Sequence, residues 1–375
     1  TALTTGDDNV AIGFEALSTE DAHGDNVAIG HQALKTLNVG TEGENVAIGK
    51  GAGTSMTTGV QSVLIGKRSG DALTDADRNT AVGYATLSGD TLGSKSTAVG
   101  YAALFTQNFT TATDTYNVAV GYEAGGAITT GDSNTLIGGL AGDALTTGTD
   151  NVAIGKDALT SDTLGSKTVA IGKNTLEAQN FTTATDANNV AIGDSAGQAL
   201  TTGVSNTLIG ALAGDAITDA DFNVAVGSGA LTADTLGSRS TALGFNTLAS
   251  QNFTTATISY NTAVGFGAGG NITTGDSNTL IGSLAGDALS TGNSNVAMGL
   301  NALGSDTKGD RNVALGMAAL TAQNFTTQTD AYNVAVGYTA GAAITTGTLN
   351  TLVGGLTGDA LTDGNQNVAV GYSAL

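Results

Sequence analysis

One short motif recurs 21 times along this chain of 375 residues. It consists of Asn, then Val or Thr, then Ala, then an aliphatic residue, then Gly, and it first occurs as Asn9-Val10-Ala11-Ile12-Gly13. The fifth position is Gly in all 21 copies, and the first position is Asn in 17 of them. Self-similarity at a short, fixed period is the signature of a repeat architecture. We therefore expect stacked repeat units instead of the two or three globular domains that the length alone would suggest.

The spacing of the motifs has a second level of order. From Asn45 onward the intervals run 17, 17, 17 and 21 residues, and this cycle of 72 residues then repeats. The predicted organisation is an irregular N-terminal stretch of coils followed by super-repeats, without a linker between them, in one continuous elongated domain. The predicted boundaries are 1–44, 45–116, 117–188, 189–260, 261–332 and a partial 333–375. Because the chain begins with Thr1 and stops just after a motif, we expect it to be a segment of a longer protein.

Each repeat predicts one coil of an all-β, parallel β-solenoid, or β-roll. Val, Ile and Thr favour strands, and the invariant Gly ends the short apolar run. A second short strand is predicted at the apolar pair that follows, as at Ala158-Leu159, before a turn rich in Thr, Gly and Asp. No single coil can bury its own core, so burial requires stacking. At about 4.8 Å per coil, 21 coils predict a rod about 100 Å long.

The first motif position has a structural interpretation. Stacked Asn side chains can hydrogen-bond to one another and to the backbone of adjacent turns. Ser and Thr, which replace Asn in four copies, can do the same less completely. The predicted ladder includes Asn9, Asn26, Asn45, Asn117, Asn189, Asn261 and Asn333.

The third and fourth motif positions are both apolar, although they face opposite sides of a strand. Position four is Ile, Val, Leu or Met throughout, and we expect it to face the solenoid interior. Position three, Ala in 16 copies and Leu in five, is then expected to face outward and to be covered by identical chains. The candidate subunit-interface residues are Leu64, Leu136, Leu208, Leu280 and Leu352. The alternative is a solenoid wide enough to cover both faces itself.

Composition excludes several classes of protein. With no Cys the chain is neither a disulfide scaffold nor a thiol enzyme, and its two His residues, His23 and His31, offer little for acid–base chemistry. A net charge of −21 argues against nucleic acid as a partner. No apolar run is long enough to span a membrane within this segment. Because almost every polar residue belongs to a periodic class, we predict no catalytic residue, no cofactor and no enzymatic activity.

Two further features leave alternatives open. Asp residues concentrate in turns, where they are good turn formers and where stacked copies could bind Ca²⁺. The 21-residue coils carry an Asn-Phe-Thr triplet, which is also an N-glycosylation acceptor sequence, on a predicted outward loop. This loop is either a packing loop whose Phe covers an apolar edge or a displayed contact site for a partner or a sugar. The candidate contact residues are Asn108, Phe109, Asn180, Phe181, Asn252, Phe253, Asn324 and Phe325.

The motif resembles the head-domain repeat of trimeric autotransporter adhesins, which has the form Asn-Val-Ala-Ile-Gly-x-x-Ala. Asn79 to Leu87 and Asn367 to Leu375 are similar to a longer repeat of phage tail-fibre proteins, Asn-Thr-Ala-Val-Gly-Tyr-x-Ala-Leu. The adhesin resemblance implies a homotrimeric, left-handed parallel β-roll. The adhesin repeat is shorter than these coils of 17 or 21 residues, which predicts longer side loops here.

Both families use the repeat as a shaft or display surface. The resemblance therefore implies a non-enzymatic shaft of an extracellular surface fibre or adhesin, with homotrimerisation, end-to-end assembly into a filament and a host-surface or glycan receptor as the expected contacts. The alternative is the shaft of a bacteriophage tail fibre on the virion surface. A third class is a glycan-binding or glycan-active solenoid, and an active one would need clustered carboxylates in a groove.

Overall fold

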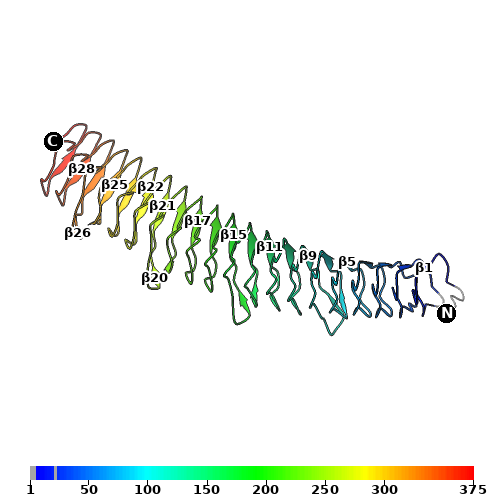
Figure 1. The fold of residues 1–375 in the computed structure, drawn as a ribbon. Helices are drawn as coiled ribbons and strands as arrows, with labels where there is room; N and C mark the ends of the chain where they lie inside the picture. The colour runs from blue at the N-terminus through cyan, green and yellow to red at the C-terminus, as the bar shows by residue number, and fades with distance from the viewer. Residues whose placement is uncertain (1–5, 21–22) are drawn as a thin grey trace. The chain divides into compact units, whose positions relative to one another are not determined.

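The computed structural model of the protein describes residues 6–20 and 23–375. Every regular element in these residues is a β-strand, and the strands belong to a parallel β-solenoid of about 21 turns. The all-β solenoid expected from the repeat is therefore confirmed. The chain divides into two compact units, 1–188 and 189–375, and their boundary coincides with a super-repeat boundary. Within each unit the coils follow one another in chain order (Figure 1).

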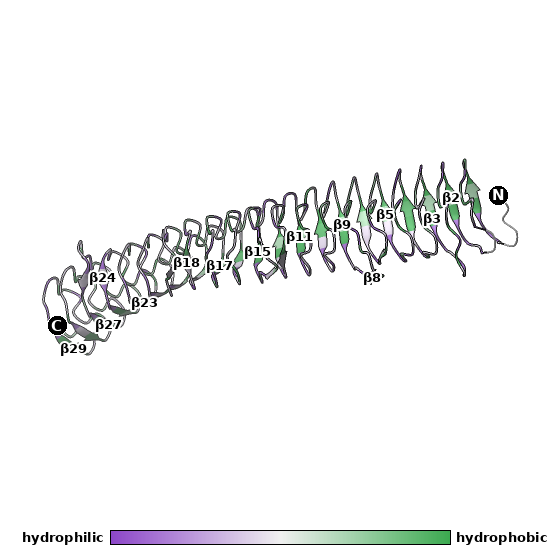
Figure 2. Cartoon of the chain, turned by 90° about the horizontal axis from the view of Figure 1, so that it is seen from below, coloured by the Kyte–Doolittle hydropathy of each residue, from purple (hydrophilic) through white to green (hydrophobic). Residues whose placement is uncertain are grey.

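In the described part of the first unit, the main sheet has ten strands, each covering positions two to four of one motif. They are β1 (Val10–Ile12), β2 (Val27–Ile29), β3 (Val46–Ile48), β4 (Val63–Ile65), β5 (Thr80–Val82), β7 (Thr97–Val99), β9 (Val118–Val120), β10 (Thr135–Ile137), β11 (Val152–Ile154) and β13 (Val169–Ile171). Two-residue strands accompany the 21-residue coils and pair as β6 (Gly93–Ser94) with β8 (Thr113–Asp114), and β12 (Gly165–Ser166) with β14 (Thr185–Asp186). Figure 2 shows hydrophobic colour on main-sheet strands such as β2 and β3.

The second unit repeats this arrangement with eleven strands in its main sheet. They are β15 (Val190–Ile192), β16 (Thr207–Ile209), β17 (Val224–Val226), β19 (Thr241–Leu243), β21 (Thr262–Val264), β22 (Thr279–Ile281), β23 (Val296–Met298), β25 (Val313–Leu315), β27 (Val334–Val336), β28 (Thr351–Val353) and β29 (Val368–Val370). Its two short pairs are β18 (Gly237–Ser238) with β20 (Thr257–Ile258), and β24 (Gly309–Asp310) with β26 (Thr329–Asp330).

Neighbouring strands pair in parallel, with identical motif positions opposite one another. Ala81, for example, pairs with Leu64 on one side and Ala98 on the other. The invariant Gly that follows each strand keeps this spacing: Gly30 has φ of +135°, and a Cβ there would lie 2.5 Å from the carbonyl oxygen of Gly49 in the next coil. Only Gly tolerates both this conformation and this approach. Consequently every coil ends its strand at the same place.

Position three, and not position four, faces the interior. Ala47, Leu64 and Ala81 are fully buried, whereas the residues on either side of them in the strands are half-buried. The expectation that position four lies inside is therefore wrong. The physical reason is the small cross-section of a 17-residue coil, which holds Ala at position three, or Leu where position nine is Gly, and leaves the side chains of positions two and four outside.

The five position-three Leu residues belong to the core and not to the outer surface. Leu64, Leu136, Leu208, Leu280 and Leu352 all have 0% exposure within the single chain, so they cannot contact a second subunit. Their extra volume is matched by Gly at position nine. A Cβ on Gly53 would lie 2.8 Å from Leu64 Cδ1, and one on Gly70 would lie 2.9 Å from Leu64 Cδ2. In other coils position nine is itself a buried Leu, such as Leu87.

The second predicted strand of each coil is a pair of turns. In the coil of β11, Asp157 and Leu159 have φ of +56° and +55°, in the left-handed region. That conformation is incompatible with an extended strand, so the expectation of a strand at Ala158-Leu159 is wrong. Alternating left-handed residues bend the chain back on itself, and both Ala158 and Leu159 become fully buried. The apolar character of this pair therefore reflects its burial in the core and does not indicate a strand.

Candidate functional site

The first-position Asn residues form a buried hydrogen-bonded ladder inside each unit. The N–H of Asn134 donates to Oδ1 of Asn117 at 2.9 Å, and Nδ2 of Asn134 donates to the carbonyl of Gly148 at 2.9 Å. Oδ1 of Asn134 in turn accepts the N–H of Asn151 at 3.1 Å. Each side chain thus ties neighbouring coils together. A turn carbonyl accepts Nδ2 of Asn9, Asn26, Asn45, Asn117, Asn189, Asn261 and Asn333 alike.

A buried carboxylate anchors each 21-residue coil to the coil before it. Oδ1 of Asp90 accepts the N–H groups of Gly93 and Phe109, each at 3.1 Å, and Oδ2 accepts Nε2 of Gln107 at 2.5 Å. Oε1 of Gln107 accepts Nδ2 of Asn117 at 2.9 Å, which joins the carboxylate to the Asn ladder. The corresponding carboxylates are Asp162, Asp234 and Asp306, and burial raises the pKa of Asp306. The sequence analysis missed this network, although the fixed Asp-to-Gln spacing of 17 residues was visible.

The long coils project as loops, as at β20 in Figure 1, but their Phe residues do not. Phe109, Phe181, Phe253 and Phe325 are only 5–6% exposed. A Cβ on Gly237 would lie 2.7 Å from Cδ2 of Phe253, so the ring covers the turn that the buried carboxylate organises. The prediction that these four Phe residues are contact sites is therefore wrong. Their burial fits the alternative, in which the Phe of each loop packs over an apolar edge. Asn108, Asn180 and Asn324 are exposed and Asn252 is half-buried, and all four accept a Thr hydroxyl through Oδ1.

Positions two and four form the outward face of the sheet. In β10 the flanking residues are Thr135 and Ile137, and the Ile137 side chain is 38% exposed around the fully buried Leu136. Position four carries Val, Ile, Leu or Met and position two carries Val or Thr, so each unit has a stripe of largely apolar, half-exposed side chains. Stripes of this kind mark interaction surfaces. Any subunit contact made by the sheet therefore belongs to positions two and four.

Position six carries stacked aromatic rings on three consecutive coils of the first unit. The ring centroids of Tyr84 and Tyr101 lie 5.2 Å apart, and those of Tyr101 and Tyr122 lie 5.3 Å apart, with interplanar angles of 9°. Nζ of Lys67 lies 5.6 Å from the Tyr84 centroid. The hydrogen bond to the Glu123 carboxylate raises the pKa of Tyr122. All three rings are exposed, and we did not single them out from the sequence.

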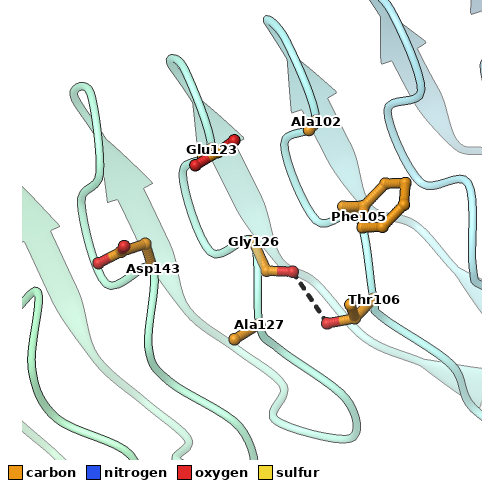
Figure 3. A pocket seen from close by; sticks show the side chains of 7 residues that line it. All are labelled: Ala102, Phe105, Thr106, Glu123, Gly126, Ala127 and Asp143. Carbon is orange, nitrogen blue, oxygen red and sulfur yellow. Dashed lines mark hydrogen bonds between the residues drawn. The ribbon is translucent and has the colours of Figure 1, made fainter.

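A cavity of about 280 Å³ is lined by residues of three consecutive coils, those of β7, β9 and β10 (Figure 3). Phe105 and Asp143 stand on the coils at its two sides, and Gly126 lies on the coil between them. Glu123 is on the same middle coil. Burial raises the pKa of Asp143, and the nearby Glu123 and Asp157 charges add to this, although a hydrogen bond from Thr160 opposes it. The cavity thus combines an aromatic ring with two carboxylates.

Other kinds of site receive no structural support. In residues 6–20 and 23–375, no group of three or more His, Asp or Glu side chains is placed to hold a metal ion, so nothing there favours the Ca²⁺ alternative. The same residues contain no helix with the length and apolar character needed to cross a membrane.

The function of this chain has to be argued from its own residues, because comparisons with known proteins assign it to no family. The chain matches no protein-family model and no curated protein.

Proposed function

We propose that this chain is a non-enzymatic structural segment of an extracellular fibre, a shaft that projects or displays binding surfaces at a cell surface. The repeated residues support this proposal, because each repeated class serves packing or hydrogen bonding: Asn in the ladder, Ala or Leu in the core, and Gly at the strand end. A solenoid gains length simply by adding coils, which suits a spacer. A surface adhesin or filament is the first candidate setting.

We also propose that the chain assembles as a homotrimer through its outward sheet face. The observation that carries this proposal is the half-exposed stripe on coil after coil, with an apolar residue at position four and Val or Thr at position two. Rotational symmetry would place the same stripe of each chain against its neighbours. Three is the number that the adhesin-like motif implies.

A phage tail-fibre shaft is the second candidate. It is favoured by the longer motif at Asn79 to Leu87 and Asn367 to Leu375, which includes an exposed Tyr at position six. The gene that encodes the full protein separates the two candidates. A membrane or cell-wall anchor supports the surface fibre, whereas a tail-attachment or self-cleaving chaperone domain supports the phage fibre.

Sedimentation equilibrium tests the assembly. The expected mass is that of three chains of 36.6 kDa, about 110 kDa. Ile137→Lys should shift the mass to 36.6 kDa, because a charge buried in an apolar interface is costly. Thr130→Lys adds the same charge on an exposed turn and should leave the trimer intact. A wild-type chain that is monomeric at high concentration would refute the assembly, and circular dichroism checks that each variant folds.

A further inference from the structure

Outward positions of the first unit differ between super-repeats, and several of the differing residues form one exposed cluster. In that region lie Arg68, Tyr84, Tyr101, Phe105, Tyr122 and Glu123. In the next super-repeat the equivalent residues are Leu140, Lys156, Lys173, Glu177, Asp194 and Ser195. Periodic residues hold the coils together, so they are the same in every super-repeat. A cluster that is not periodic, and that lies together at the surface, needs a separate explanation.

The cavity beside Phe105 arises from a gap in one row of side chains. Position ten carries Phe105, Gly126 and Asp143 on three consecutive coils, and Gly126 contributes no side chain between the other two (Figure 3). Since coils stack at about 4.8 Å, Phe105 and Asp143 are about 10 Å apart along the stack. That separation, less the thickness of the two side chains, accommodates one ring-shaped ligand. The volume of about 280 Å³ is at the small end of ligand pockets.

A second cavity of about 260 Å³ continues from the first and shares Ala102, Phe105 and Glu123 with it. Its other walls include the rings of Tyr84 and Tyr101. The combined site therefore extends across several coils of one unit, which suits a ligand of more than one ring.

The lining chemistry identifies the class of ligand. Aromatic side chains supply apolar surface for the C–H groups of a sugar ring, while the Glu123 and Asp143 carboxylates accept hydrogen bonds from its hydroxyls. The cation in the lining, Arg68, is held by Asp71 at 2.7 Å. With two carboxylates in the site and a net charge of −21, an acidic sugar would be repelled.

We propose that this double cavity binds an uncharged oligosaccharide, with one pyranose ring between Phe105 and Asp143 and the next against Tyr84 and Tyr101. This inference goes beyond the shaft function, since a shaft needs only its periodic residues. It makes the fibre itself a glycan-contacting surface at one defined place along the chain.

Saturation-transfer NMR on the whole chain tests the site, because it detects weak, millimolar binding. The probes are maltotriose, cellotriose, mannotriose and tri-N-acetylchitotriose as uncharged sugars, with trigalacturonate as the acidic comparison. The expected result is transfer to at least one uncharged trisaccharide and none to trigalacturonate. Absence of transfer to every uncharged probe overturns the proposal, as does equal binding of trigalacturonate. Sedimentation equilibrium tests the proposed homotrimer independently of any sugar binding.

Gly126→Gln closes the gap without straining the backbone. The equivalent residue of the next super-repeat is Gln198, so this coil type already accommodates that side chain. A Cβ on Gly126 would have its nearest contact at 3.2 Å, with the carbonyl oxygen of Glu123. The variant should weaken binding at least tenfold, and Phe105→Ala should weaken it roughly tenfold through the lost ring contact.

A matched control is provided by the second unit. There Gly270 occupies the same position beside Ala249 and Asp287, in a cavity of about 300 Å³ that has Gly267 in the place of Glu123. Gly270→Gln fills that cavity and should leave sugar binding unchanged. If Gly126→Gln binds as well as the wild type, or if Gly270→Gln abolishes binding instead, the assignment to Phe105 and Asp143 is wrong.

Discussion

Removal of one Asn from the ladder should destabilise the solenoid by an amount that its contacts define. In Asn134→Ala, the carbonyl of Gly148 loses the Nδ2 donor and the N–H of Asn151 loses the Oδ1 acceptor. Both groups point to the side chain of residue 134, which is fully buried and therefore out of contact with water. A stranded buried polar group costs about 1–3 kcal/mol, so the two together should lower the free energy of unfolding by about 2–6 kcal/mol.

Asn134→Ser is the matched control, because Ser already occupies this position in three coils. Where Ser62 stands in the ladder, its Oγ accepts the N–H of Asn79 at 3.1 Å. A Ser at position 134 should therefore keep a partner for the N–H of Asn151 and strand only the carbonyl of Gly148. The expected cost is about 1–3 kcal/mol, roughly half that of the Ala variant.

Amide hydrogen exchange at Asn151, combined with urea unfolding, measures the difference. Each 1.4 kcal/mol lost from the opening free energy speeds exchange about tenfold. Exchange at Asn151 should therefore be much faster in Asn134→Ala than in Asn134→Ser. If both variants cost less than about 0.5 kcal/mol, as surface substitutions do, or if they cost the same, the ladder is not what couples the coils.

Two further variants test the core and the buried carboxylate. Leu64→Ala should lower the unfolding free energy by about 2–5 kcal/mol, since its side chain fills the space above two Gly residues, and urea unfolding measures it. Burial raises the pKa of Asp306, so the folded state binds this proton more tightly than the unfolded state. The stability that this proton supplies is present in acid and is lost as the pH rises through the raised pKa. The cost of Asp306→Asn should therefore shrink from about pH 3 to about pH 7, and an unchanged cost would contradict the burial argument.

The sequence was sufficient for the repeat, the main-sheet strands and the stacking, because these depend on periodicity and on β-propensity, but it wrongly predicted a second strand at Ala158-Leu159. It did not determine which face of each strand lies inside the solenoid. Positions three and four are both apolar, so alternation separates them without showing which one lies inside. A usable signal was nevertheless present: Leu64 occurs at position three in a coil that has Gly70 at position nine, while Ala81 occurs in a coil that has Leu87 there. Such an exchange of volume between two positions means that both share one interior.

The difference between periodic and non-periodic residues explains why the sequence misled us about the Phe residues of the long loops and did not reveal the cavity. Phe109 was conspicuous because it recurs every 72 residues, but recurrence in a solenoid is evidence of a packing role, and the ring is buried. Phe105 and Glu123 have no identical counterpart in any other super-repeat, and they were overlooked. A periodic scaffold makes every coil chemically alike, so a ligand can select one place along it only through residues that break the period. In this chain the search for function should therefore begin where the super-repeats differ.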